Sequence, residues 1–130
     1  MSTLETNLYN QITALRLPTP EREYRFAAIH VGMGRGIRER LEQHGLKDWR
    51  MDFAWPGLKF AVECEGGGWS GGRHTRGVGF AGDMQKYHHA MRLGWDVYRC
   101  DGALVKNGDA AQLISDIVSM RLAMLSERIA

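Results

Sequence analysis

Residues 49–64 carry the pattern that most constrains the fold, because two apolar alternations flank a Pro-Gly pair. The alternating residues are Met51, Phe53, Trp55, Phe60, Val62 and Cys64. Alternation over a short run is typical of a strand with one buried face, and Pro-Gly is typical of a turn. The sequence therefore predicts strands at 49–55 and 58–64, joined into a hairpin with Pro56 and Gly57 as its loop.

Three acidic residues fall on polar positions of this hairpin. With a two-residue loop, Asp52 is expected opposite Ala61 and diagonal to Glu63, roughly 5 to 7 Å away, with Glu65 on the same face. Carboxylates this close repel one another, which raises a pKa or requires a cation, and such oxygen ligands suit Mg²⁺. The alternative is an ordinary solvated strand face. The largely apolar run at 59–62 favours a central strand instead, where an unpaired carboxylate is costly.

The composition fits one domain, 1–130, because 130 residues of which 44% are hydrophobic can build a proper core. The formal net charge is only +2, so overall charge does not predict nucleic-acid binding. Basic residues nevertheless flank the hairpin in sequence. They are Arg35, Arg38, Arg40 and Lys47 before it, and Arg73, His74 and Arg76 after it. This distribution predicts an anionic polymer held around an acidic centre.

The two cysteines, Cys64 and Cys100, are too few for a disulfide framework or a zinc quartet, and we expect reduced core thiols. Residues 1–17 are interrupted by polar side chains, so they are predicted to be neither a signal peptide nor a membrane span. We therefore expect a cytoplasmic protein that does not bind membranes.

The first predicted helix covers residues 4–15, with Leu8, Tyr9, Ile12 and Leu15 on one face. Glu5 falls on the same face. This glutamate is expected either to point toward the packed side of the helix or to interact with the helix dipole from the first turn. The sequence leaves both interpretations open.

Further along the chain, periodicity predicts strands at 23–29 and 95–100 and helices at 37–44, 80–93 and from Asp109 to the C-terminus. The helix at 37–44 belongs to a short insertion at about 32–46, and residues 66–82, with eight of the 16 glycines, are predicted to be a loop. The expected core residues of the last two helices are Phe80, Met84, Tyr87 and Met91, then Leu113, Ile114, Ile117, Met120 and Met124. The resulting order, αβββαβ with a C-terminal helix, predicts an α/β fold with a mixed central sheet flanked by helices.

This order, with an acid on the second strand and Glu63-Cys64-Glu65 on the third, resembles the PD-(D/E)XK nuclease superfamily. Residues 49–99 are similar to small phage and prophage endonucleases related to very-short-patch repair enzymes and Holliday-junction resolvases. The loop at 71–77 and the run at 83–87 strengthen the match. The resemblance implies a restriction-endonuclease-like core and a Mg²⁺-dependent DNA endonuclease, with Mn²⁺ as a substitute cation, in phage or prophage DNA processing, repair or recombination in a bacterial host cell.

The resemblance also implies a metal site. Asp52 and Glu63 match the metal carboxylates, and the backbone carbonyl of Cys64 matches a third ligand. Glu5 matches an acid that the first helix often contributes in such folds, with Glu23 as the substitute if the first strand approaches the site instead.

Glu65 departs from the superfamily pattern, because it stands where a lysine usually orients or deprotonates the attacking water. A carboxylate there would bind metal or act as general base. Lys86 on the following helix is the candidate replacement for that lysine. Its alternative role is a solvated ion pair with Asp83, three residues earlier.

Arg73, His74 and Arg76 would form a phosphate-binding loop, in which the arginines contact phosphates and His74 protonates the leaving oxygen. The alternative function is a catalytically inactive DNA-binding accessory module of the same fold. Two cuts in a duplex or junction would require two active sites and hence a homodimer. The sequence fixes neither the preferred DNA structure nor the oligomeric state.

Overall fold

The computed structural model describes residues 1–66 and 78–129. Its centre is a four-stranded sheet in the order β1-β2-β3-β4, formed by β1 (Glu21–Tyr24), β2 (Met51–Trp55), β3 (Phe60–Glu65) and β4 (Asp96–Asp101). β1 and β2 are antiparallel, β2 and β3 are antiparallel, and β3 and β4 are parallel. The predicted mixed sheet flanked by helices is therefore confirmed.

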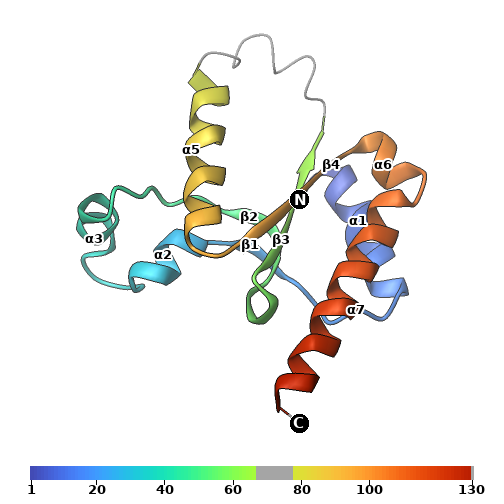
Figure 1. Cartoon of the computed structure of the whole chain (residues 1–130). Helices are drawn as coiled ribbons and strands as arrows, with labels where there is room; N and C mark the ends of the chain where they lie inside the picture. The colour runs from blue at the N-terminus through green and yellow to red at the C-terminus, as the bar shows by residue number, and fades with distance from the viewer. Residues whose placement is uncertain (67–77, 130) are drawn as a thin grey trace.

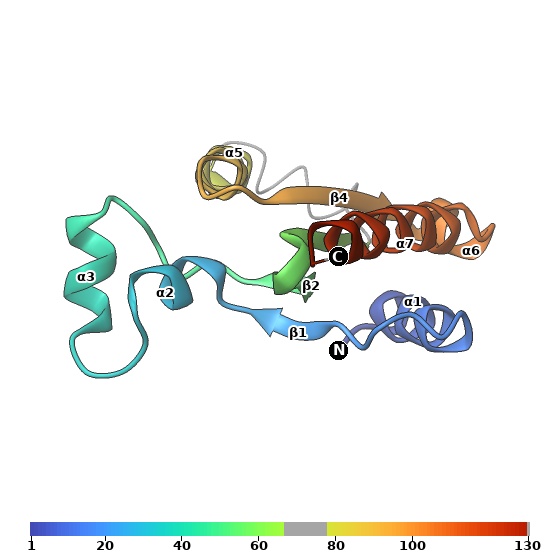
Figure 2. The ribbon, with the colours of Figure 1, turned by 60° about the horizontal axis from the view of Figure 1, so that its bottom comes forward.

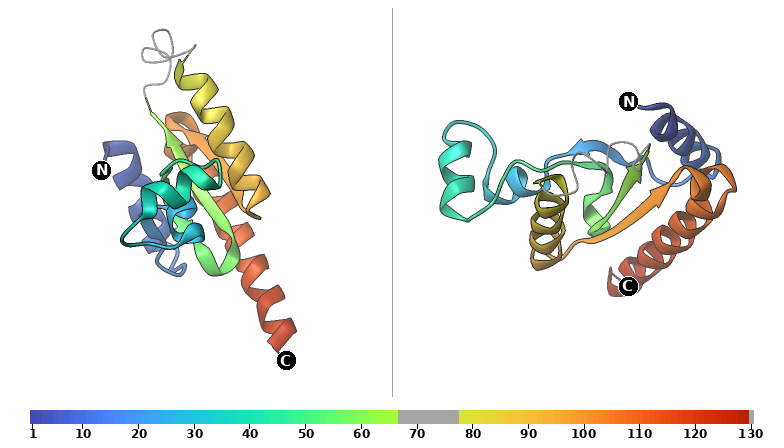
Figure 3. Two further views of the ribbon diagram at one scale, coloured as in Figure 1. Left: turned by 90° about the vertical axis from the view of Figure 1, so that its left-hand side faces the viewer. Right: turned by 90° about the horizontal axis from the view of Figure 1, so that it is seen from above.

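The helices cover both faces of this sheet (Figures 1 and 3). On one side lie α1 (Thr3–Ala14) and α7 (Asp109–Ile129), with the short α6 (Gly102–Lys106) preceding α7. On the other lie α2 (Phe26–Val31), α3 (Ile37–Gln43) and α5 (Val78–Arg92), of which α5 makes the connection between the parallel strands β3 and β4. Among the described residues, no helix combines the length and apolar character needed to cross a bilayer.

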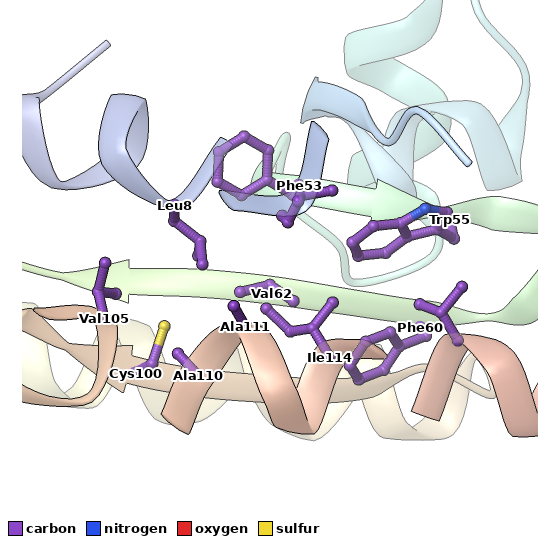
Figure 4. Packing of buried hydrophobic residues seen from close by; sticks show 12 residues of the cluster. Leu8, Phe53, Trp55, Phe60, Val62, Cys100, Val105, Ala110, Ala111 and Ile114 are labelled. Carbon is purple, nitrogen blue, oxygen red and sulfur yellow. The ribbon is translucent and has the colours of Figure 1, made fainter. Parts of the chain in front are cut away.

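Two hydrophobic clusters correspond to these two faces. Figure 4 shows the first, where Leu8 of α1, Val62 of β3 and Ile114 of α7 point into one space and are all fully buried. The second cluster contains Phe26 of α2, Leu41 of α3, Ala61, Ala90 and Trp95. Because apolar side chains are buried on both of its faces, the sheet is a central layer, and polar groups buried in it need partners.

Several predicted boundaries are wrong. The strand expected at 23–29 ends at Tyr24, and residues 26–31 form α2, whose Phe26, Ala27 and Ala28 are buried. The final helix packs through residues earlier than expected, since Leu113, Met120 and Met124 are exposed. Its buried residues are Ala110, Ala111, Ile114 and Val118. In both places tertiary packing selected a different apolar set from the one that local periodicity favoured.

The hairpin loop is also longer than predicted. Pro56–Leu58 form a single 3-10 turn, and Lys59 follows in the left-handed region with φ 53°. The loop therefore has four residues, and Ala61 pairs with Ala54 rather than with Asp52. Extending that register by one residue beyond Phe53 and Val62 places Asp52 directly opposite Glu63.

Candidate metal and catalytic site

Asp52 and Glu63 are joined by reciprocal contacts between strands β2 and β3. The backbone N–H of Asp52 donates to Glu63 Oε2 at 3.0 Å, and the backbone N–H of Cys64 donates to Asp52 Oδ2 at 2.8 Å. Each carboxylate thus binds the main chain of the other strand, which fixes its position. Glu63 is the one buried charged residue in the described part of the chain, with 7% of its surface exposed.

Helix α5 supplies the partners that the buried Glu63 requires. Lys86 Nζ forms an ion pair with Glu63 Oε1, and the Tyr87 hydroxyl donates to the same oxygen at 3.2 Å. Burial and the Glu63 charge raise the pKa of Tyr87, so this hydroxyl stays protonated and can donate. Lys86 itself is largely buried. The structure therefore places Lys86 at the acidic site and pairs it with Glu63, rather than with Asp83.

This arrangement requires α5 to face the sheet differently from the prediction. Met84 and Met91, expected in the core, are 59% and 73% exposed, whereas Ala90 is buried. Residues 86 and 90 are four apart and share one side of the helix, so the side that buries Ala90 also directs Lys86 to the sheet. Tyr87, interpreted from the sequence as an apolar core residue, is a hydrogen-bond donor to the site.

Asp52 lies beside two further acids. Carboxylate oxygens of Glu5, Glu23 and Asp52 lie within 4.8 Å of one another, a grouping that could hold a metal ion. Glu5 of α1 therefore reaches the site, and so does Glu23 of β1, although the sequence presented them as alternatives. Glu23 has a φ of 50°, an uncommon conformation for a non-glycine residue, and it interrupts the pairing of β1 with β2 between Arg22 and Tyr24.

The electrostatics of Asp52 reflect this crowding. Burial is the largest cause that raises its pKa, and the Glu63 and Glu5 charges add to it, while the hydrogen bond from Cys64 opposes them. The pKa of Asp52 is about 7 as a result. A nearby cation would stabilise the ionised form of a carboxyl group whose pKa is raised this far, because the positive charge offsets both the cost of burial and the repulsion from the other acids. The oxygen ligands that Glu5, Glu23 and Asp52 offer, of which only Glu23 is exposed, are of the kind that a hard divalent ion such as Mg²⁺ binds.

Glu65 is engaged elsewhere. Its Oε1 accepts from Arg99 Nε of β4 at 2.6 Å, and both side chains are substantially exposed. The Arg99 guanidinium also lies over the Tyr87 ring, 4.6 Å from its centroid. The Glu65 charge is thus compensated by Arg99. The sequence did not predict this partner, because the alternation of residues in a strand does not indicate which residue of a neighbouring strand lies beside it.

Of the remaining residues predicted for the site, Cys64 lies beside Asp52, and the three residues of the phosphate-binding loop are not among the described residues. Cys64, the candidate carbonyl ligand, is fixed by its hydrogen bond to Asp52, and its thiol is free, as is that of the buried Cys100 beside it in β4. Arg73, His74 and Arg76 lie outside the described residues.

The chain matches no family model, no curated protein and no solved structure.

Proposed function

We propose that the protein is a Mg²⁺-dependent endonuclease that hydrolyses phosphodiester bonds of DNA in the cytoplasm of a bacterial host. The observation that carries this proposal is the contact of Lys86 with Glu63 beside Asp52. It supplies a cation at a site whose local sequence has Glu65 in place of a lysine. Two neighbouring carboxylates can hold a metal ion for hydrolysis, and a lysine paired with one of them can orient the attacking water.

Asp52 and Glu63 would hold the metal. Glu5 and Glu23 have carboxylate oxygens within 4.8 Å of an oxygen of Asp52, a grouping that does not include Glu63, and they would contribute oxygen atoms or bind the water ligands of the metal from the Asp52 side. A bound Mg²⁺ would supply Lewis-acid stabilisation of the charge that develops on the phosphate and would lower the pKa of a bound water. The chain's part is to fix the ligands. Two hydrogen bonds do so, because the rigid main-chain N–H groups of Asp52 and Cys64 donate to the carboxylates of Glu63 and Asp52.

Lys86 has a separate role in this proposal. Its ammonium group is held at the Glu63 carboxylate, where it can orient the attacking water or offset negative charge on the phosphate. Tyr87, donating to the same oxygen, keeps Glu63 oriented between α5 and β2. Glu65 is the less suitable water-orienting group, because it is paired with Arg99 at an exposed position.

The test is a cleavage assay with branched, mismatched, single-stranded and plain duplex DNA in the presence of Mg²⁺, Mn²⁺ or EDTA. Wild type is expected to cut at least one substrate with a divalent ion and none in EDTA. Asp52→Asn and Glu63→Gln should abolish cutting while DNA binding persists. Asp116→Asn, an exposed acid on α7, is the matched control and should cut normally. Undiminished cleavage by either site variant would refute the site.

One observation favours the alternative, a DNA-binding accessory module without turnover. Both oxygens of Glu63 already have protein partners, Oε1 with Lys86 and Tyr87 and Oε2 with the Asp52 N–H. A glutamate whose two oxygens both have protein partners can also be one half of an ion pair that only stabilises the fold. The two functions differ in metal dependence, because the accessory module would bind DNA equally well in EDTA and would never nick it.

A further inference from the structure

The loop between α2 and α3, Gly32 to Gly36, is organised around the part-buried side chain of Arg40. The Arg40 guanidinium donates to the carbonyl oxygens of Gly32 (3.1 Å from Nε), Arg35 (2.6 Å from Nη1) and Met33 (3.3 Å from Nη2). The Gly34 carbonyl lies 3.5 Å from Nη2. Four consecutive carbonyl groups therefore point to the inside of the loop.

This orientation determines where the N–H groups of the loop point. In a trans peptide the C=O and N–H bonds point in opposite directions, and the described part of the chain has no cis peptide bond. The N–H groups of residues 33–36 must therefore point away from Arg40, and all four residues are exposed. Within the described residues none of these four N–H groups donates to a protein acceptor. The outer surface of the loop thus presents the N–H groups of residues 33–36 as hydrogen-bond donors that are unpaired in the described part of the chain, and the Arg40 guanidinium lies on the inner side of the loop.

The glycines make this surface possible. Gly32, Gly34 and Gly36 have φ values of 106°, 98° and 82°, a region that residues with a Cβ rarely adopt. At Gly34 an added Cβ would meet nothing within 4 Å, so this glycine is not required by internal packing. Its effects are the backbone conformation and a surface on which a ligand can approach the main chain.

Charge around the loop favours an anion. Residues 25–50 contain six Lys and Arg against three Asp and Glu, an excess of three positive charges in a chain whose net charge is +2. Of the three acids, Asp48 is paired with Arg25, and Glu39 and Glu42 are exposed on α3, the helix that also carries Arg38 and Arg40. Arg35 and Arg38 are exposed, and neither has an ion-pair partner among the described residues.

We propose that the Gly32 to Gly36 loop, with Arg35 and Arg38, binds phosphates of a nucleic-acid backbone. Backbone N–H groups and arginines are ordinary phosphate contacts in protein–DNA complexes. A convex loop cannot enclose a small free anion, but it can lie against an extended polyanion. The inference deepens the proposed function, on which its choice of DNA as the polyanion rests, by adding a backbone contact that needs no metal. Figure 2 shows α3 at the opposite end of the molecule from α6 and α7, so a cation on α6 lies far from this loop and can serve as a control.

The test measures binding to a fluorescein-labelled duplex by anisotropy, in EDTA and over a series of salt concentrations. Arg35→Ala and Arg38→Ala should each weaken binding and lower the salt slope by about 0.9, the value for one lost phosphate contact. Gly34→Ala, which changes no charge, should weaken binding about 5-fold by misdirecting the amides. Lys106→Ala, an exposed cation of α6, is the control of equal charge and should bind like wild type.

If Lys106→Ala lost as much affinity for the duplex as the arginine variants, the effect would be one of net charge and the proposal would be overturned. Unchanged binding by the two arginine variants would overturn it as well. Binding to phosphatidylserine vesicles without binding to duplex would overturn it in favour of a lipid surface. Circular dichroism melts confirm that each variant is folded. The two proposals fail separately, because a wild type that never cuts refutes the nuclease alone, whereas a cutting enzyme whose loop variants bind normally refutes the loop alone.

Discussion

Replacing Asp52 with asparagine should stabilise the metal-free protein. Burial and the Glu63 and Glu5 charges raise the pKa of Asp52 to about 7, so its ionised form is disfavoured in the folded state. Asparagine is almost the same size and carries no charge. Its side-chain oxygen can still accept the hydrogen bond that the Cys64 N–H gives to Asp52 Oδ2 at 2.8 Å. The substitution therefore removes repulsion and keeps the strand contact.

The size of the effect follows from the pKa. An ordinary aspartate has a pKa of about 3.9, and each unit of difference corresponds to 1.36 kcal/mol, so ionising a group with a pKa of about 7 costs about 4 kcal/mol of folding free energy. Asp52 is only part-buried, and solvent screening reduces this to about 2 kcal/mol. For a domain of this size that difference corresponds to a rise in Tm of about 5 to 10 °C.

The pH dependence has a definite sign. Between about pH 4 and pH 7 the folded state holds the Asp52 proton more tightly than the unfolded chain, so this group lowers wild-type stability as the pH rises. The advantage of Asp52→Asn should accordingly be full above pH 7 and disappear toward pH 4.

Thermal melts of wild type and Asp52→Asn in EDTA, at about pH 8 and about pH 5, measure this advantage, with Asp116→Asn as the control. Millimolar Mg²⁺ or Mn²⁺ should raise the Tm of wild type but not of Asp52→Asn. A variant that is destabilised at pH 8, together with a wild type indifferent to divalent ions, would show that the acids are an ordinary solvated strand face.

Three further outcomes are expected. Lys86→Ala should lower the cleavage rate by about 100-fold, while Glu65→Gln should cost less, and single-turnover kinetics that show the reverse order would transfer the water-orienting role to Glu65. Tyr87→Phe should destabilise the fold by about 1 kcal/mol, measured by urea denaturation, because Glu63 Oε1 loses a donor, and an unchanged midpoint would make that hydrogen bond irrelevant. Arg73→Ala and Arg76→Ala should each weaken binding to all DNA sequences alike and reduce the salt slope by about one phosphate contact, whereas a loss confined to one sequence would indicate base recognition.

The sequence by itself determined the hairpin of β2 and β3 and placed Asp52 and Glu63 on the same face of it. Alternating apolar residues define β2 and β3 whatever surrounds them, because successive side chains in a strand point to opposite faces. The predicted register was off by two residues, since Lys59 adopts a left-handed conformation and lengthens the loop. A shift of two keeps every side chain on its predicted face, which is why the acids still meet.

Tertiary structure alone decided which groups join them. The periodicity of a helix is compatible with more than one face packing against the sheet. In α5 the packed face is the one that buries Ala90 and brings Lys86 to Glu63, and Met84 is left exposed. The partner of Glu65 depended on β4 lying parallel to β3, which brings Arg99 within reach. These contacts join residues distant in the chain, and local periodicity holds no information about them.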